Sequence, residues 1–125
     1  MPYPTMATLT PTKWGPDVAP SADLSASVTT AATAGGDAWL LQGREFLIVK
    51  NGDGSPHTVT IVSQKNSFGT QNAADDLVRS VAAGKIAVIG PLSAIRFRDA
   101  NGLAQVTYDA VTSVTVLLAA VAVTG

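Results

Sequence analysis

Short apolar runs, separated at regular intervals by turn-forming residues, constrain the fold of this chain more than any other feature. From residue 24 onward the runs are interrupted at 35–36 (GG), 51–54 (NGDG), 90–91 (GP) and 99–102 (DANG). Glycine, asparagine, aspartate and proline favour turns. Short strands at about 8–12-residue spacing are typical of β-sandwiches and barrels. The sequence therefore predicts an all-β domain over residues 24–125, a small antiparallel sandwich or barrel of about seven or eight strands.

The individual strands are predicted from their side-chain patterns. Residues 24–30 and 57–63 alternate between apolar and polar side chains, whereas 44–50 contains four consecutive apolar residues. Alternation indicates one buried face, and a continuous run indicates a strand covered on both faces. We expect 44–50 and 57–63 to form a hairpin around the turn at 51–54. Further strands are expected at 85–89, 94–97, 104–108 and 112–123, with a type I′ turn at Asn101-Gly102.

The segment 72–84 fits two structures. Asn72 could cap a helix in which Leu77 and Val81 are four residues apart, and Gly84 could end it. A strand with Leu77 and Val81 on one face fits equally well. We favour the strand because the segments on both sides are predicted strands.

The first 23 residues form a separate proline-rich arm. Five of the seven prolines lie there, and proline lacks a backbone donor, so we expect an extended arm that does not pair regularly inside a sheet. The arm is either a disordered tail or an ordered segment lying on a neighbouring subunit. Tyr3 and Trp14 favour the second interpretation, because aromatic residues are enriched at interfaces. Both are therefore candidate interface residues.

Composition excludes several classes of partner. Net charge is −1 and the basic residues form no stripe, so we expect no nucleic-acid partner. The longest apolar run, 116–123, is far shorter than the roughly 20 residues of a membrane helix, and no signal peptide is visible. Only 14% of residues are charged, against about 25% on average. A surface this neutral is either rich in hydrated Ser and Thr or covered by a partner.

Arg96 and Arg98 are two further candidate interface residues. They lie two positions apart, so on the strand expected at 94–97 and just beyond it they would share a face. That face could pair with acidic groups of a neighbouring molecule.

The residues available for catalysis are few. His57 is the only histidine and Glu45 the only glutamate, and there is no cysteine. A Ser-His-Asp triad needs a nucleophile motif that the chain lacks, and a zinc site needs three or four suitable ligands. We therefore expect His57 to be a surface turn residue, and we predict no catalytic residue, no metal and no cofactor.

The aspartates also lack a catalytic arrangement. Asp75 and Asp76 would point to opposite faces of a strand, whereas glycosidases need two carboxylates facing each other across a cleft. We expect both to be solvated in a loop. Asp53 and Asp99 each lie beside an asparagine in a calcium-loop-like fragment, but turn formation explains both fragments without a metal.

Four segments resemble a known family. Residues 43–52 (GREFLIVKNG), 81–92 (VAAGK followed by IGPL), 97–102 (FRDANG) and the closing strands around 106–108 and 114–116 resemble motifs of small tailed-bacteriophage head decoration, or capsid cement, proteins. The resemblance covers about residues 43–122 and excludes the arm. Leu92 stands where that family often has an aromatic residue.

The resemblance implies a virion structural protein on the capsid exterior, made in the host cytoplasm. Its expected partners are the major capsid protein and other copies of itself, with a trimer favoured. The family offers no catalytic residue to carry over. Two alternatives remain: another virion part, such as a head–tail connector or tail-tube subunit, or a carbohydrate-binding sandwich, which would need a strip of exposed aromatic residues.

Overall fold

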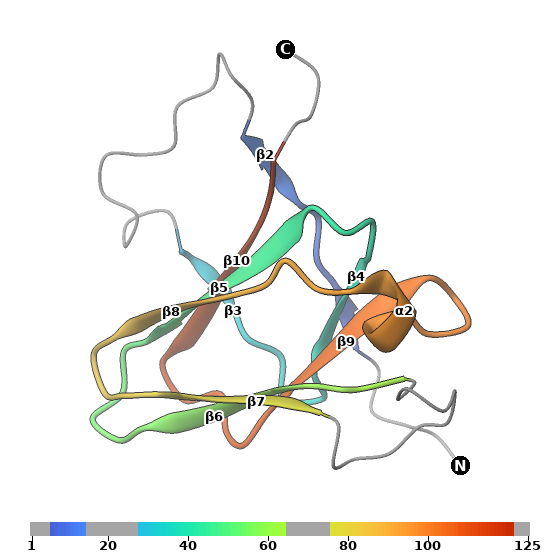
Figure 1. Cartoon of the computed structure of the whole chain (residues 1–125). Helices are drawn as coiled ribbons and strands as arrows, with labels where there is room; N and C mark the ends of the chain where they lie inside the picture. The colour runs from blue at the N-terminus through green and yellow to red at the C-terminus, as the bar shows by residue number, and fades with distance from the viewer. Residues whose placement is uncertain (1–5, 15–27, 65–75, 122–125) are drawn as a thin grey trace.

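Two β-sheets pack face to face around one core (Figure 1). The computed structural model describes residues 6–14, 28–64 and 76–121. The first sheet has the order β1-β4-β9-β6-β7, and the second has the order β2-β10-β5-β8 with β3 also paired to β10. The strands of the first sheet are β1 (Ala7–Thr8), β4 (Asp37–Leu40), β9 (Leu103–Tyr108), β6 (His57–Ile61) and β7 (Leu77–Val81). Those of the second are β2 (Thr12–Trp14), β10 (Val114–Val121), β5 (Glu45–Asn51), β8 (Ile86–Ile89) and β3 (Thr30–Ala31). The predicted all-β fold is confirmed.

Alternating side chains from the two sheets fill the core. Leu47 and Val49 of β5 and Val59 and Ile61 of β6 point inward and are essentially inaccessible to solvent, as is Trp39 of β4. This period of two is the one seen in the sequence, since successive side chains of a strand point to opposite faces.

The strand β5 is covered on both faces, as its continuous apolar run predicts. On the outer face Ile48 is buried in a smaller cluster with Val28 and Ala119, against which Phe46 and Leu117 pack. The outer face of the second sheet is therefore apolar around β5 and β10.

The expected hairpin between 44–50 and 57–63 is wrong. β5 pairs with β10 and β8, whereas β6 pairs with β9 and β7. Both strands bury one face in the common core, so they lie on opposite sides of it. The turn after Asn51 consequently carries the chain from the second sheet to the first. A second crossing, residues 82–85, returns it from β7 to β8.

The strand alternative for the ambiguous segment is confirmed over β7, which pairs with β6 in antiparallel register. Residues 72–75 lie outside the described residues. So do residues 24–27 of the first expected strand. Of its described residues, 28–30, only Thr30 belongs to a strand, β3. The strands expected at 85–89, 104–108 and 112–123 are confirmed as β8, β9 and β10.

The strand expected at 94–97 is a single helical turn, α2 (Ala94–Phe97). Backbone hydrogen bonds from Phe97 N to Ser93 O and from Arg98 N to Ala94 O close it. The turn places the Phe97 ring in the core, which an edge strand at this position would not do. The turn at Asn101-Gly102 therefore connects α2 to β9 instead of joining two paired strands.

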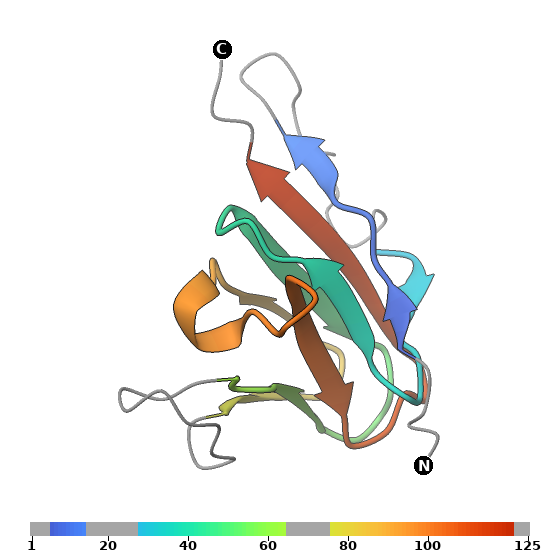
Figure 2. The ribbon, with the colours of Figure 1, turned by 90° about the vertical axis from the view of Figure 1, so that its right-hand side faces the viewer.

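Part of the arm adds short strands to the edges of the body, whereas the sequence analysis expects only an extended arm that does not pair regularly inside a sheet. β1 adds in parallel to β4 of the first sheet, and β2 adds in parallel to β10 of the second; Figure 2 shows β2 alongside β10. Leu9 lies between the two strands, packs against the core and donates its backbone N–H to Ala38 O at 2.7 Å. These short strands avoid the prolines, because Pro11 lies between β1 and β2, where the chain passes from one sheet to the other. The expected domain boundary at residue 23 lies outside the described residues.

In the described part of the chain, no helix has the length and hydropathy needed to cross a lipid bilayer.

Candidate functional site

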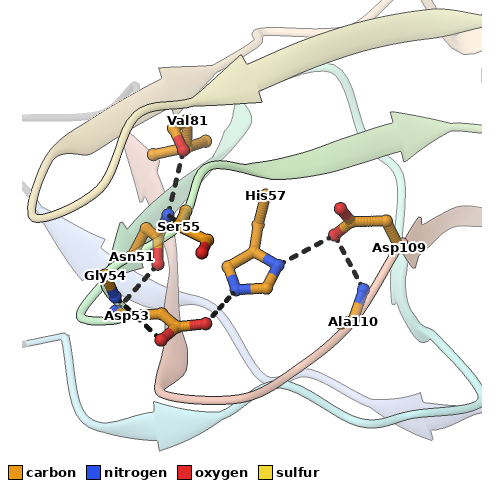
Figure 3. A network of polar contacts seen from close by, with 8 residues as sticks. All are labelled: Asn51, Asp53, Gly54, Ser55, His57, Val81, Asp109 and Ala110. Carbon is orange, nitrogen blue, oxygen red and sulfur yellow. Dashed lines mark hydrogen bonds and ion pairs between the residues drawn. The ribbon is translucent and has the colours of Figure 1, made fainter.

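The most concentrated polar chemistry in the described residues is a carboxylate–imidazole–carboxylate network at one end of the sandwich (Figure 3). His57, at the start of β6, lies between two aspartates. Its Nε2 is 2.8 Å from Asp53 Oδ2, and its Nδ1 is 3.1 Å from Asp109 Oδ1. Asp53 comes from the crossing turn after β5, and Asp109 directly follows β9.

The turn that presents Asp53 is built by Asn51. The Asn51 side-chain oxygen accepts the Asp53 N–H at 2.9 Å, and its amide nitrogen donates to the carbonyls of Ser55 and Val81. The Asn51 side chain is buried, so satisfying its donors internally stabilises this turn geometry. This agrees with the expectation that the Asn51–Asp53 fragment is explained by turn formation.

His57 is buried and not a surface residue, which corrects the sequence expectation. Only 7% of it is exposed. The Gly-Ser-Pro sequence before it indicates a turn, but the partner on its other side, Asp109, is 52 positions away. No local pattern could have shown that contact.

Electrostatics in the network favour a protonated imidazole. Hydrogen bonds with Asp53 and then Asp109 raise the pKa of His57. The hydrogen bond with His57 is the main cause that lowers the pKa of Asp53. Burial opposes ionisation of Asp109, but hydrogen bonds with the Thr58 backbone and with His57 outweigh it and lower its pKa.

This geometry lets His57 hold two segments of the chain together. When protonated, the imidazole donates one N–H to each carboxylate, joining the crossing turn to the end of β9. The two carboxylates lie on opposite sides of the ring, so they do not converge on a common point. Across the described ranges, no group of three or more His, Cys, Asp or Glu side chains is arranged to hold a metal ion.

Two other acids are also used structurally. Glu45 is buried, and its Oε1 accepts the backbone N–H groups of Gln42 and Gly43 at 2.8 and 3.2 Å. Asp76, expected in a solvated loop, accepts the Ser63 N–H at 2.7 Å and so joins the two ends of the connection between β6 and β7. Asp75 lies outside the described residues.

A buried pair that the sequence did not indicate ties β4 to β9. The Tyr108 hydroxyl donates to Asp37 Oδ2 at 2.7 Å, and Asp37 is fully buried. Burial, and then the hydrogen bond to Asp37, raise the pKa of Tyr108 well above its ordinary value. In the sequence, the only indication of this pair is the single charged residue, Asp37, in the otherwise apolar strand β4.

The structure does not place Arg96 and Arg98 on one strand face. The guanidinium carbon of Arg96 lies 4.7 Å from the centre of the Phe97 ring, a cation–π contact. Arg98 donates from both Nε and Nη2 to the Leu41 carbonyl, bracing α2 against the end of β4. An open hollow of about 300 Å³ lies beside it, lined by Ala94, Ile95, Arg98 and Asp99.

The two aromatic candidates in the arm have different outcomes. Tyr3 lies outside the described residues. The backbone of Trp14 ends β2 and is in register with Val121 of β10. The pairing of Trp14 with its own body neither supports nor opposes a role at an interface.

No protein-family model matches the chain, and neither the curated proteins nor the solved structures contain a significant match.

Proposed function

We propose that this protein binds the outer surface of an assembled tailed-phage capsid and stabilises the shell, with the major capsid protein as partner. The observation that carries the proposal is the contrast between its polar and apolar groups. The polar groups around His57 and the Glu45 carboxylate are bonded to other groups of the protein itself. By contrast, several large apolar side chains are exposed: Leu40, Val78, Ile86, Val88 and Ile95. Ile86 and Val88 share the outer face of β8, beside the apolar cluster around Ile48, and a contiguous apolar patch suits a surface that a partner covers.

Ile95 is the most exposed of these residues, at 81%. It projects from α2, whose neighbours Phe97 and Arg98 fix the turn to the core and to β4. Because the backbone of this turn is already held in place, docking through Ile95 would order little more than that one side chain, which favours a binding role for this corner.

Ile86 and Val88 lie within the segments that resemble decoration proteins, and Ile95 lies between two of these segments. Residues 43–52 include β5, and residues 81–92 include β8 with its flanking turns. Residues 97–102 include the last residue of α2 and the turn that follows it. These proteins are expected to act as trimers. A trimer attached at three points gains avidity by orders of magnitude over one subunit.

A carbohydrate-binding role has less support. Trp39 and Phe97 are buried, and Phe46 and Tyr108 are partly buried. Among aromatic residues with described side chains, none forms the exposed strip on which sugars stack.

The decisive experiment mixes the purified protein with procapsids and with expanded capsids of the phage that encodes it. Binding to expanded capsids alone, seen by co-sedimentation, and a higher temperature of capsid disruption are expected. Ile95→Asp should weaken binding, whereas Thr107→Asp, on β9, serves as the control. Absence of binding to both shells would rule the proposal out, and co-sedimentation with tails would favour a connector or tube role.

A further inference from the structure

Among the described residues, each sheet has an open edge at the end opposite the short strands β1, β2 and β3, and these two edges differ. β7 ends the first sheet and pairs only with β6, and β8 ends the second sheet and pairs only with β5. An open edge presents backbone donors and acceptors that can pair with another strand.

The backbone groups that face outward from β8 follow from its register with β5. Asn51 N donates to Lys85 O at 2.9 Å, and antiparallel pairs alternate between hydrogen-bonded and non-bonded positions. The bonds to β5 therefore fall at Lys85, Ala87 and Ile89. The N–H and C=O groups of Ile86 and Val88 point away from the sheet.

The same reasoning applies to β7, but one of its outward carbonyls is already occupied. Asp109 N donates to Thr58 O, so Thr58 bonds toward β9 and its opposite residue Ser80, like Val78, turns its backbone groups outward. The Arg79 guanidinium donates to the outward Val78 carbonyl at 3.0 Å. A charged side chain on an edge strand discourages pairing with another chain.

β8 carries no such protection. Its four residues, Ile-Ala-Val-Ile, include neither a charge nor a proline. Ile86 and Val88 are 37% and 57% exposed on the outer face of the sheet. Val88 is also in register with the buried Ile48 of β5, so the exposed side chains extend an apolar surface that is already present.

We infer that β8 is a self-association edge, which pairs with β8 of a second copy in antiparallel orientation. The strand is complementary to itself. With the two Ala87 residues facing each other, Ile86 of each copy lies opposite Val88 of the other, and all outward N–H and C=O groups of these residues are paired. The four apolar side chains then form one cluster on the outer face, and Lys85 faces Ile89 instead of another lysine.

This two-fold contact is separate from the threefold contact expected of a trimer on the shell. It does not depend on the proposed capsid role, and its test needs no shell. Sedimentation equilibrium of the purified full chain over micromolar to millimolar concentrations is compared with the same measurement on Val88→Pro. Proline removes an outward N–H while leaving the β5 ladder intact. The wild-type mass should approach twice that of Val88→Pro, with the dissociation constant raised about tenfold or more in the variant.

Val78→Pro on β7 is the matched control, because Val78 has the same side chain, a similar exposure of 51% and an outward N–H. It should associate like the wild type. Val88→Lys, which keeps every backbone donor, tests the contact again if Val88→Pro does not fold. The inference would be refuted if the wild-type mass never doubles. It would also be refuted if the Val78 and Val88 variants lose self-association equally. If the wild type shows no self-association but Val88→Pro loses capsid binding, the inference is refuted too, and β8 is instead a contact with the capsid.

Discussion

At the residue scale, the side chain with the most consequence is His57. It joins two segments of chain, the crossing turn and the end of β9, through hydrogen bonds of 2.8 and 3.1 Å. Both bonds require a donor on the ring. A neutral imidazole carries one N–H and so leaves one carboxylate facing a ring lone pair.

The stability of the protein should therefore fall as pH rises through the pKa of His57. Its folded pKa is raised above the ordinary value of 6.5, so the folded state holds the proton more tightly and is favoured at lower pH. The contribution is complete below pH 6.5 and disappears above the folded pKa. Urea unfolding midpoints between pH 5 and 9 should decline, and His57→Gln should flatten that decline.

Lowering the pH into the acid range also weakens the network, this time by protonating the aspartates. The pKa values of Asp53 and Asp109 are lowered from 3.8, so their contribution is present above that value and is lost as pH falls through the folded pKa. The network should stabilise the fold most between about pH 4 and 6.5. A wild-type profile identical to that of His57→Gln would contradict this account.

Two glycines provide a second residue-scale prediction. Gly36 and Gly43 both have positive φ, +99° and +93°, but a Cβ at Gly36 would lie 2.6 Å from Val106 O, whereas at Gly43 nothing lies within 4 Å. Gly43→Ala should cost about 1–2 kcal/mol from backbone strain alone. Gly36→Ala should lower the free energy of unfolding by about 3 kcal/mol or more in denaturant titrations. Equal costs would show that the close approach to β9 is relieved without penalty.

At the scale of elements, alternation identified strands but not their partners. The inward positions of β5, β6 and β9 follow from a local period of two, which any strand obeys. Whether β5 pairs with β6 or faces it across the core depends on non-local contacts, and the turn residues Asn51 and Gly52 suit both outcomes. Phe97 shows the same limit, since its burial selects a helical turn where the local pattern allows a strand.

The candidate site was predictable only in part for a similar reason. The prediction that Asn51 and Asp53 form a turn is confirmed, because the hydrogen bond between them spans only two positions. The contact of His57 with Asp109 and that of Asp37 with Tyr108 span 52 and 71 positions. Such pairs are set by strand register and leave no mark on the surrounding sequence.

The arm is the element for which the structure differs most from the sequence prediction. β1, Leu9 and β2 complete the side of the sandwich where β4 and β10 would otherwise be open. Deleting residues 1–14 should therefore lower the free energy of unfolding by about 2 kcal/mol or more, because Leu9 burial and several backbone bonds are lost. Deleting residues 1–5 leaves these contacts intact and is the control in the same thermal or urea measurement. Equal effects of the two deletions would place the stabilisation elsewhere.

This changes how a role of the arm in capsid binding should be tested. Removing residues 1–20 would affect the fold and the binding together. Removing residues 1–5 deletes Tyr3 while keeping β1 and β2, so a loss of capsid affinity would then report on the interface alone.

At the scale of the whole molecule, most strand pairs join distant parts of the chain. β4 pairs with β9, and β10 pairs with both β5 and β2. Contacts this distant in sequence slow folding, because long loops must close before the contacts form. Refolding should take milliseconds to seconds, measured by stopped-flow fluorescence of the buried Trp39 in a Trp14→Phe background. Microsecond refolding would contradict it.

The parallel pairing of β2 with β10 has a mechanical consequence. These are the second and the last of the described strands, and Thr12 to Trp14 lie beside Ala119 to Val121 in the same direction. Tension applied through the two chain ends would run along this pair, so its hydrogen bonds would be loaded in shear and resist together. A hairpin pulled at its open end would instead unzip one bond at a time. The sandwich is thus oriented to withstand stretching between its termini.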